Sequence, residues 1–256
     1  MNQPFPTAPP GIPYITTAQM REVDRAMIDD FGITLLQMME NAGRNLADVV
    51  IRTVLAGLGG GPRGRRVVVG AGPGGNGGGG LVAARHLHNR GCEVLVVLAA
   101  QEDRVSDAVR HQLNILRSSG VSIEPAENDE ENVSIRDADV VIDALFGYSL
   151  SGSPREPAAS LIRVVNESGT PVVSNDIPTG IDATTGTVYE PAIRATATVT
   201  IALPKTGLLP SDARRMTGDL YLGDISVPPE LYLAVLDISV PTIFAASQVV
   251  KLAEPD

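Results

Sequence analysis

The sequence predicts an α/β protein built as a three-layer α/β/α sandwich, with a mostly parallel central sheet preceded by two helices. From residue 65 onward, short β-branched runs alternate with helical segments. Nearly continuous apolar strands that are separated by helices indicate a parallel sheet with both faces covered. Before residue 66 the periodic segments have helical spacing, which places two helices ahead of the first strand.

The two leading helices carry start and stop signals. Thr16 and Gln19 have the spacing of a capping box, and Gly32 ends the first helix. Thr34 precedes the second helix, whose apolar residues recur every three or four positions until the stretch GLGGGP at 57–62.

The later elements follow from the alternation. Strands are predicted at 65–70, 92–99, 139–143, 171–175 and 196–203, with helices near 79–90, 103–119 and 157–168. The stretch GDLYLGDISVPPEL predicts a last, edge strand. Residues 1–256 are interpreted as one domain, with a loose Pro-rich lead-in at 1–15 and a less regular tail at 229–256. The acidic run at 127–132 is interpreted as a solvated loop.

Composition argues against several kinds of partner. Lys and Arg number 20 against 30 Asp and Glu, a formal net charge of −10. This balance argues against nucleic acid and anionic membranes, because both attract basic surface. No apolar run approaches the roughly 18 residues of a membrane span. Cys92 is the only cysteine and the N-terminus lacks the regions of a signal peptide, so we expect a cytoplasmic protein.

Polar groups are expected to gather where the predicted strands end. The strand at 65–70 leads into GAGPGGNGGGG at 70–80, while Asp143 and Asp176 close two other strands. Ligands of doubly wound sheets bind outside the carboxyl ends of the strands, so these groups would share one crevice. Glycines admit close backbone approach, and a helix N-terminus favours a phosphate. The stretch lacks the Lys and hydroxyl of a P-loop, however, and glycines that only allow tight strand–helix packing are the alternative.

Each polar residue also has a purely structural interpretation. Asp143 could cap nearby loop amides, and Asp176, which precedes Ile-Pro, could form an Asx-turn. Lys205 in LPKTG is interpreted as a structural or supporting residue, because a sequence does not show the environment that activates an amine.

Several segments together resemble a known family. In order within residues 16–228 they are TAQMREVD, LLQMMENAGRNLA, GPGGNGGGGLVAARHL, VVIDALFG, NDIPTGID and ATATVTIALPKTGL. They are similar to the N-terminal YjeF domain, which is the fold of the NAD(P)H-hydrate epimerases. The stretch GYSLSGSPREP resembles the apolipoprotein A-I-binding-protein type of this family.

The resemblance implies a Rossmann-like three-layer fold, often dimeric, and an isomerase of metabolite repair. Such enzymes interconvert the R and S epimers of hydrated NADH and NADPH (NADHX and NADPHX), so that a separate NAD(P)HX dehydratase can act. By resemblance, Asp176 is the substrate-contacting acid/base residue, and potassium (K+) is bound by Asn76, Asp143 and Thr179. The implied substrate contacts are Gly75, Asn76, Gly77, Gly78, Gly79, Gly147, Tyr148, Ser149, Leu150, Ser151, Gly152, Ser153 and Asp176.

The sequence departs from the family pattern in the Gly-rich stretch. Gly75 stands where the family has Asn, and Gly79 stands where it has Asp. Two hypotheses therefore stay open: a working epimerase, or an impaired domain that binds a nucleotide or a protein partner. An NAD-dependent oxidoreductase fits poorly, because Ala99 and Ala100 stand where a ribose-binding carboxylate is expected.

Overall fold

Residues 5–126 and 133–253 are described in the computed structural model, and their strands form one sheet. The strand order is β3-β2-β1-β4-β5-β6-β7-β8, with neighbours parallel except for β7 and β8. The strands are β1 Arg66–Ala71, β2 Glu93–Leu98, β3 Ser122–Pro125, β4 Val140–Ala144, β5 Val172–Asn175, β6 Ala197–Ile201, β7 Asp219–Gly223 and β8 Val249–Lys251. The predicted solvated loop at 127–132 lies outside the described residues.

The helices precede, connect and follow these strands. They are α1 Thr17–Asp29, α2 Leu35–Val50, α3 Gly75–His88, α4 Asp107–Ser118, α5 Val133–Arg136, α6 Ala158–Ser168, α7 Ser211–Thr217 and α8 Pro229–Leu236. A π-helical turn at Ile51–Leu55 prolongs α2, and 3-10 turns lie at Glu102–Arg104 and Thr206–Leu208.

Both predicted helix starts are confirmed. The Thr16 hydroxyl accepts a hydrogen bond from the Gln19 N–H at 3.3 Å, and the Gln19 side chain accepts one from the Thr16 N–H at 2.9 Å. Thr34 and Gln37 form the same reciprocal pair before α2. These bonds satisfy N–H groups that the first turn of a helix leaves without a backbone partner.

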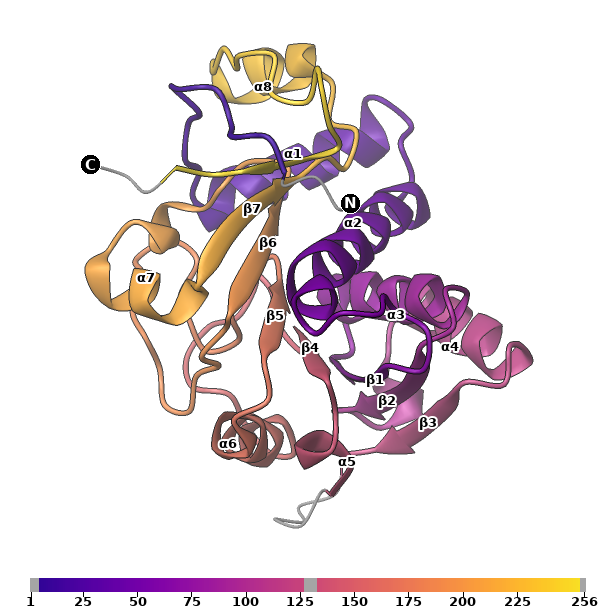
Figure 1. Ribbon diagram of the computed structural model, residues 1–256. Helices are drawn as coiled ribbons and strands as arrows, with labels where there is room; N and C mark the ends of the chain where they lie inside the picture. The colour runs from indigo at the N-terminus through magenta and orange to yellow at the C-terminus, as the bar shows by residue number, and fades with distance from the viewer. Residues whose placement is uncertain (1–4, 127–132, 254–256) are drawn as a thin grey trace.

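Helices cover both faces of the sheet, which confirms the three-layer α/β/α architecture (Figure 1). α2, α3 and α4 pack on one face, against Val67, Val69 and Ile142. α5 and α6 pack on the other face, against Val68 and Val141. Successive strand residues point to opposite faces, so covering both faces requires apolar residues at consecutive positions.

The N-terminal segment differs from the loose lead-in predicted for residues 1–15. In its described part, Thr7 forms a bridge with Lys251 of β8, and Ile15 forms one with Lys205 after β6. Phe5 is buried in the core. Its Pro-rich composition suggested a free chain, but long-range backbone pairing, which the local pattern does not reveal, holds residues 5–15 in place.

The C-terminal end of the sheet also differs from the prediction. The predicted edge strand, β7, lies inside the sheet, because β8 pairs with it antiparallel on its outer side. α1 and α8 share a core with Leu222 of β7, and Figure 1 shows the two helices beyond that end of the sheet. β8 has three residues and α8 has eight, which is too short for a periodic pattern to stand out.

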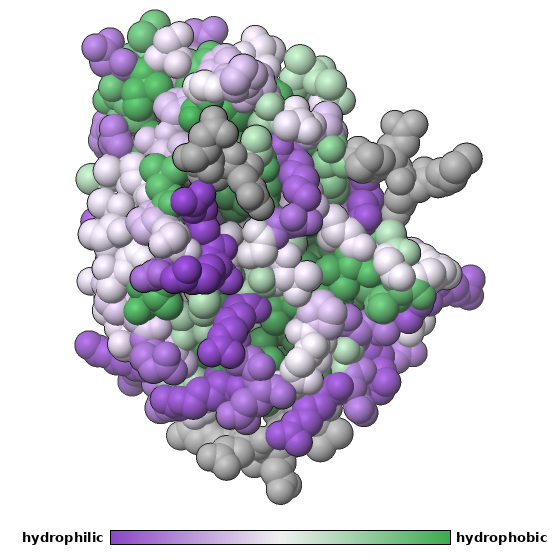
Figure 2. Space-filling model, turned by 60° about the vertical axis from the view of Figure 1, so that its left-hand side comes forward, coloured by the Kyte–Doolittle hydropathy of each residue, from purple (hydrophilic) through white to green (hydrophobic). Residues whose placement is uncertain are grey.

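None of the described helices is long and apolar enough to cross a bilayer. On the face shown in Figure 2, hydrophilic and apolar residues are interspersed, without one continuous apolar band across it. Scattered apolar side chains of this kind are ordinary on a folded protein and need no partner to explain them.

Candidate functional site at the carboxyl ends of the strands

A pocket opens at the carboxyl ends of the parallel strands, and its walls include the segments after β1, β4 and β5. The order of the strands reverses between β1 and β4, which is where doubly wound sheets form a crevice. The pocket has a volume of about 260 Å³. Of the predicted substrate-binding residues, it is lined by Gly75, Asn76, Gly147, Tyr148, Ser149 and Asp176.

Asp176 follows β5 and is held in a strained position. Its backbone φ is 67°, in the left-handed region that few residues other than Gly, Asn and Asp adopt. Its side chain is buried, and its two carboxylate oxygens have different partners. Oδ1 accepts a hydrogen bond from the Lys205 ammonium at 2.5 Å, and Oδ2 accepts one from the Tyr148 N–H at 3.0 Å. The carboxylate orientation is therefore fixed at the pocket wall.

Lys205 is completely buried beneath this pocket wall. Its ammonium also donates a hydrogen bond to the Ile201 carbonyl at 2.8 Å. The backbone around it is anchored by Ile15, whose N–H bonds Pro204 and whose carbonyl accepts from Thr206. Lys205 is therefore the direct cationic partner of Asp176. The sequence indicated only a structural or supporting role for Lys205 and did not identify this partner.

Asp24 of α1 adds a second carboxylate to the same pocket. The Tyr148 hydroxyl donates a hydrogen bond to Asp24 Oδ2 at 2.5 Å. Burial raises the pKa of Asp24, while the hydrogen bond from Tyr148 acts in the opposite direction. Burial and the neighbouring Asp24 also raise the pKa of Tyr148, so the phenol stays a hydrogen-bond donor. The sequence analysis did not identify Asp24.

Asp143 and Thr179, two predicted potassium ligands, lie in direct contact below the pocket. The Thr179 hydroxyl donates to Asp143 Oδ1 at 2.6 Å, and its N–H donates to Oδ2 at 2.8 Å. Ser174 and the Leu145 N–H complete the hydrogen bonds to Asp143. Burial raises the pKa of Asp143, and no basic side chain among the described residues forms an ion pair with it. Its described partners are thus all uncharged hydrogen-bond donors.

Asn76, the third predicted potassium ligand, lies in the first turn of α3 and meets the end of β5. The Asn175 amide donates hydrogen bonds to Asn76 Oδ1 at 3.0 Å and to the Asn76 carbonyl at 3.2 Å. Asn175 also lines the pocket, although the sequence analysis did not select it. The remaining amide atoms, Asn76 Nδ2 and Asn175 Oδ1, are buried without a hydrogen-bond partner.

The other predicted substrate-binding glycines lie inside α3 and pack against neighbouring elements. A Cβ on Gly77 would approach the Gly72 carbonyl oxygen to 2.0 Å, and one on Gly78 would approach the Met39 side chain to 2.6 Å. A Cβ on Gly79 would meet Asn175 Nδ2 at 2.8 Å. These contacts match the tight-packing alternative. The remaining predicted residues follow Ser149 and are not among those that line this pocket: Leu150, Ser151, Gly152 and Ser153.

The fold and this pocket define a class of protein: a doubly wound α/β protein with a ligand site of carboxylates and a Gly-rich helix start at the switch point of its sheet. Residues 35–207 match the family described as YjeF-related protein N-terminus. The chain belongs to this family, as its motifs predicted.

Relatives and a solved structure agree with this assignment. The chain is 44% identical to the NAD(P)H-hydrate epimerase of Dehalogenimonas lykanthroporepellens, over 87% of this chain and 85% of that protein. It is 35% identical to the bifunctional NAD(P)H-hydrate repair enzyme Nnr of Moorella thermoacetica, over 85% of this chain but only 41% of that protein. The crystal structure of yeast ynu0, YNL200c, matches with a TM-score of 0.80 and 28% identity, over 94% of this chain and 100% of that chain.

Proposed function

We propose that this chain is an NAD(P)H-hydrate epimerase, an isomerase that interconverts the R and S epimers of NADHX and NADPHX. One observation carries the proposal: a buried carboxylate, Asp176, is fixed by Lys205 in the wall of the switch-point pocket, in a chain 44% identical to a named epimerase. Gly75 and Gly79 leave this carboxylate and its partners in place.

The size and lining of the pocket support the ring end of a dinucleotide as its ligand. A volume of about 260 Å³ is below the roughly 300–1,000 Å³ of sites that enclose a whole small molecule, so it suits one ring. Met38, Met39 and Ile225 provide apolar contact. The first turn of α3 borders the pocket through Gly75 and Asn76, and its N–H groups favour a nearby phosphate.

The expected reaction inverts a carbon that bears a hydroxyl and adjoins the ring nitrogen. Whether the hydroxyl leaves and returns or the ring opens, one group must give a proton and one must take it. We assign proton transfer at this carbon to Asp176, whose orientation is set by the ammonium of Lys205 and the N–H of Tyr148. Lys205 forms an ion pair with this buried carboxylate and supplies the positive charge beside it.

We also propose potassium as the ion that balances Asp143. Asn76, Asp143 and Thr179 offer oxygen donors, the chemistry that hard cations prefer, and the buried Asp143 carboxylate has no basic partner among the described residues. Bound potassium would supply charge balance and order the segments around Asp143. Potassium chloride should therefore raise the melting temperature more than lithium chloride at equal ionic strength. Asp143→Asn should abolish this difference.

The activity test starts from a mixture of R and S NADPHX and an S-specific dehydratase. The dehydratase alone consumes the S form and then waits on spontaneous epimerisation. Addition of this protein with potassium should cause rapid consumption of the remaining R form, and Asp176→Asn should abolish the effect. Asp212→Asn is the matched control, because it makes the same change on an exposed turn of α7. Nucleotide binding without turnover would instead support the binding-module hypothesis.

We also propose two associations of this protein, one with a dehydratase and one with a second copy of the chain. Coupling to a dehydratase is supported by relatives whose name describes a bifunctional NAD(P)H-hydrate repair enzyme. A homodimer, implied by the family resemblance, is tested by light scattering on the purified protein at several concentrations.

A further inference from the structure

Asp24 and Asp176 line one pocket although they lie far apart in the sequence, and Tyr148 connects them. The Tyr148 hydroxyl bonds the Asp24 carboxylate at 2.5 Å, and its backbone N–H bonds Asp176 Oδ2 at 3.0 Å. The Thr17 hydroxyl, at the start of α1, donates to the Tyr148 carbonyl at 3.2 Å. α1 is therefore held against the segment after β4 at two points, which fixes the position of Asp24 in the pocket.

The two carboxylates differ in their electrostatic partners. Lys205 forms an ion pair with Asp176 and does not form one with Asp24. Two carboxyl groups therefore line the pocket, and the ammonium of Lys205 beneath its wall is paired with only one of them. Burial raises the pKa of Asp24 and so favours its protonated form; the charge of Asp176 acts in the same direction, while the hydrogen bond from Tyr148 and the charge of Lys205 act in the opposite one. The two carboxyl groups thus have different partners, Lys205 for Asp176 and the Tyr148 hydroxyl for Asp24, and unlike surroundings suit two carboxyl groups to opposite roles in proton transfer.

We propose that Asp24 is the second acid/base residue of the site, the group that delivers a proton to the departing hydroxyl while Asp176 accepts one. This inference rests on the proposed epimerase function and extends it, because it divides the two proton transfers between two residues.

The step balances with water as the only other reactant. Asp24 gives its proton to the hydroxyl, the C–O bond breaks with its electron pair on oxygen, and water leaves. The lone pair of the ring nitrogen forms a C=N bond to the same carbon. Water then adds to the opposite face of that carbon: its electron pair forms the new C–O bond, the π electrons of the C=N bond return to the ring nitrogen as its lone pair, and Asp176 takes the released proton. Exchange with solvent returns the proton to Asp24.

The groups that face Asp24 define the expected pH dependence. They are Tyr148 from the segment after β4, Asp176 after β5, Lys205 after β6 and Tyr232 of α8, while Arg21 of α1 faces Tyr148. Asp24 must be protonated to act as the acid, so kcat/KM should decrease as pH rises through its pKa. The hydrogen bond from Tyr148 lowers that pKa. Tyr148→Phe should therefore move this decrease to higher pH.

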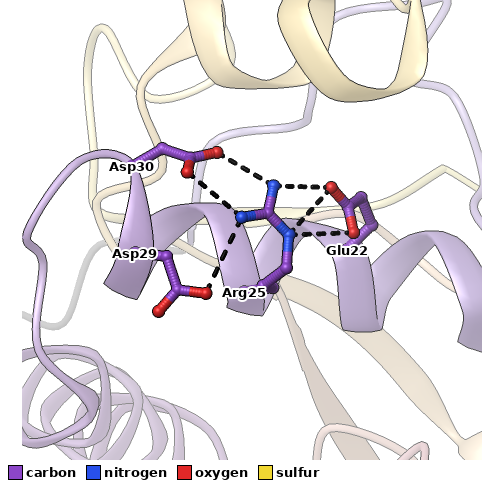
Figure 3. Close-up of polar contacts among 4 residues, drawn as sticks. All are labelled: Glu22, Arg25, Asp29 and Asp30. Atoms are coloured by element: carbon purple, nitrogen blue, oxygen red, sulfur yellow. Dashed lines mark hydrogen bonds and ion pairs between the residues drawn. The ribbon is translucent and has the colours of Figure 1, made fainter.

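The test measures kcat/KM for R-NADPHX against pH, with excess dehydratase, in the wild type, Asp24→Asn, Asp24→Glu and Tyr148→Phe. Asp24→Asn should lose about 10²–10⁴-fold in kcat/KM and should lack the alkaline decrease. Asp24→Glu should restore part of the rate and the pH dependence. Asp29→Asn is the control, because it changes another Asp of α1 on the outer side, beside Glu22, Arg25 and Asp30 (Figure 3).

Three outcomes would overturn the inference. The first is an Asp24→Asn rate within threefold of the wild type. The second is a reduced rate with an unchanged pH profile, which would show that Asp24 only supports the fold. The third, if Asp24→Asn fails to fold, is a Tyr148→Phe profile that does not move. The proposed function fails separately, and the inference with it, if the wild-type protein does not accelerate epimerisation.

Discussion

Lys205→Met should destabilise the protein strongly, because it removes the cation from a buried ion pair. The side chains of Lys205 and Asp176 are 0% and 3% exposed, with 2.5 Å between Nζ and Oδ1. Methionine keeps most of the volume but leaves the carboxylate with the Tyr148 N–H as its remaining partner among the described contacts. Removing one member of a buried pair costs about 3–5 kcal/mol. For a domain of this size that loss corresponds to a fall of about 6–20 °C in melting temperature.

The assay is urea unfolding of Lys205→Met, Asp176→Asn and the double variant. Neutralising Asp176 in the Lys205→Met background should recover most of the lost stability, because no unpaired charge is then buried. Lys251→Met is the matched control: its ammonium bonds Asp219 at 2.8 Å, but the two side chains are 44% and 56% exposed, so the lost pair contributes at most about 1 kcal/mol. Losses that simply add in the double variant would refute the buried-pair argument.

Three further predictions concern Asp24 of α1, Gly79 of α3 and Cys92, which precedes β2. Asp24→Asn should raise the melting temperature at pH 7 and leave it unchanged near pH 3. Burial raises the pKa of Asp24 in the folded protein, so its ionised form destabilises the fold only above the ordinary Asp pKa of about 3.8. An equal gain at both pH values would contradict this. Gly79→Ala should lower the free energy of unfolding by about 1 kcal/mol, because the new Cβ would lie 2.8 Å from Asn175 Nδ2. In the Asn175→Ala background this contact is gone and only the higher helix propensity of Ala remains, so the same change should be neutral or stabilising. Burial raises the pKa of the Cys92 thiol to about 11, so Ellman's reagent at pH 8 should react with it only after urea is added; rapid reaction with the folded protein would show that the thiol is accessible.

The alternation of strands and helices predicted the layers because it is a local pattern. Each buried strand from 65–70 to 196–203 reads as a continuous apolar run, and the Thr16–Gln19 spacing marks a helix start. The edge of the sheet was not predicted, because it depends on pairing between segments that are far apart in the sequence. β8 exists because it pairs with β7, and residues 5–15 are ordered because they pair with segments far along the chain. Neither pairing leaves a periodic signal in the segment itself.

The candidate site likewise contains residues that the sequence could predict and residues that it could not. Asp143 and Asp176 could be selected from their positions at strand ends, because topology alone brings the ends of parallel strands together. Asp24 could not, since nothing in α1 shows that its carboxylate meets Tyr148 across the sequence. The sequence drew attention to Lys205, but it did not show that Lys205 forms an ion pair with Asp176. Which cation reaches which buried carboxylate depends on side-chain packing, and the sequence pattern specifies only the elements that carry them.

The two glycines that raised doubt about activity have different surroundings in the structure. Gly75 borders the pocket, but Gly79 is buried within α3, and the space beyond it holds the Asn175 amide. That amide bonds Asn76 and lines the pocket from the end of β5. A Cβ on residue 79 would lie 2.8 Å from Asn175 Nδ2, so a side chain there would require the Asn175 amide to shift from its present position. Glycine at 79 therefore does not leave the pocket without a polar group: Asn175 lines it beside Asp176, whose ion pair with Lys205 is intact in this chain.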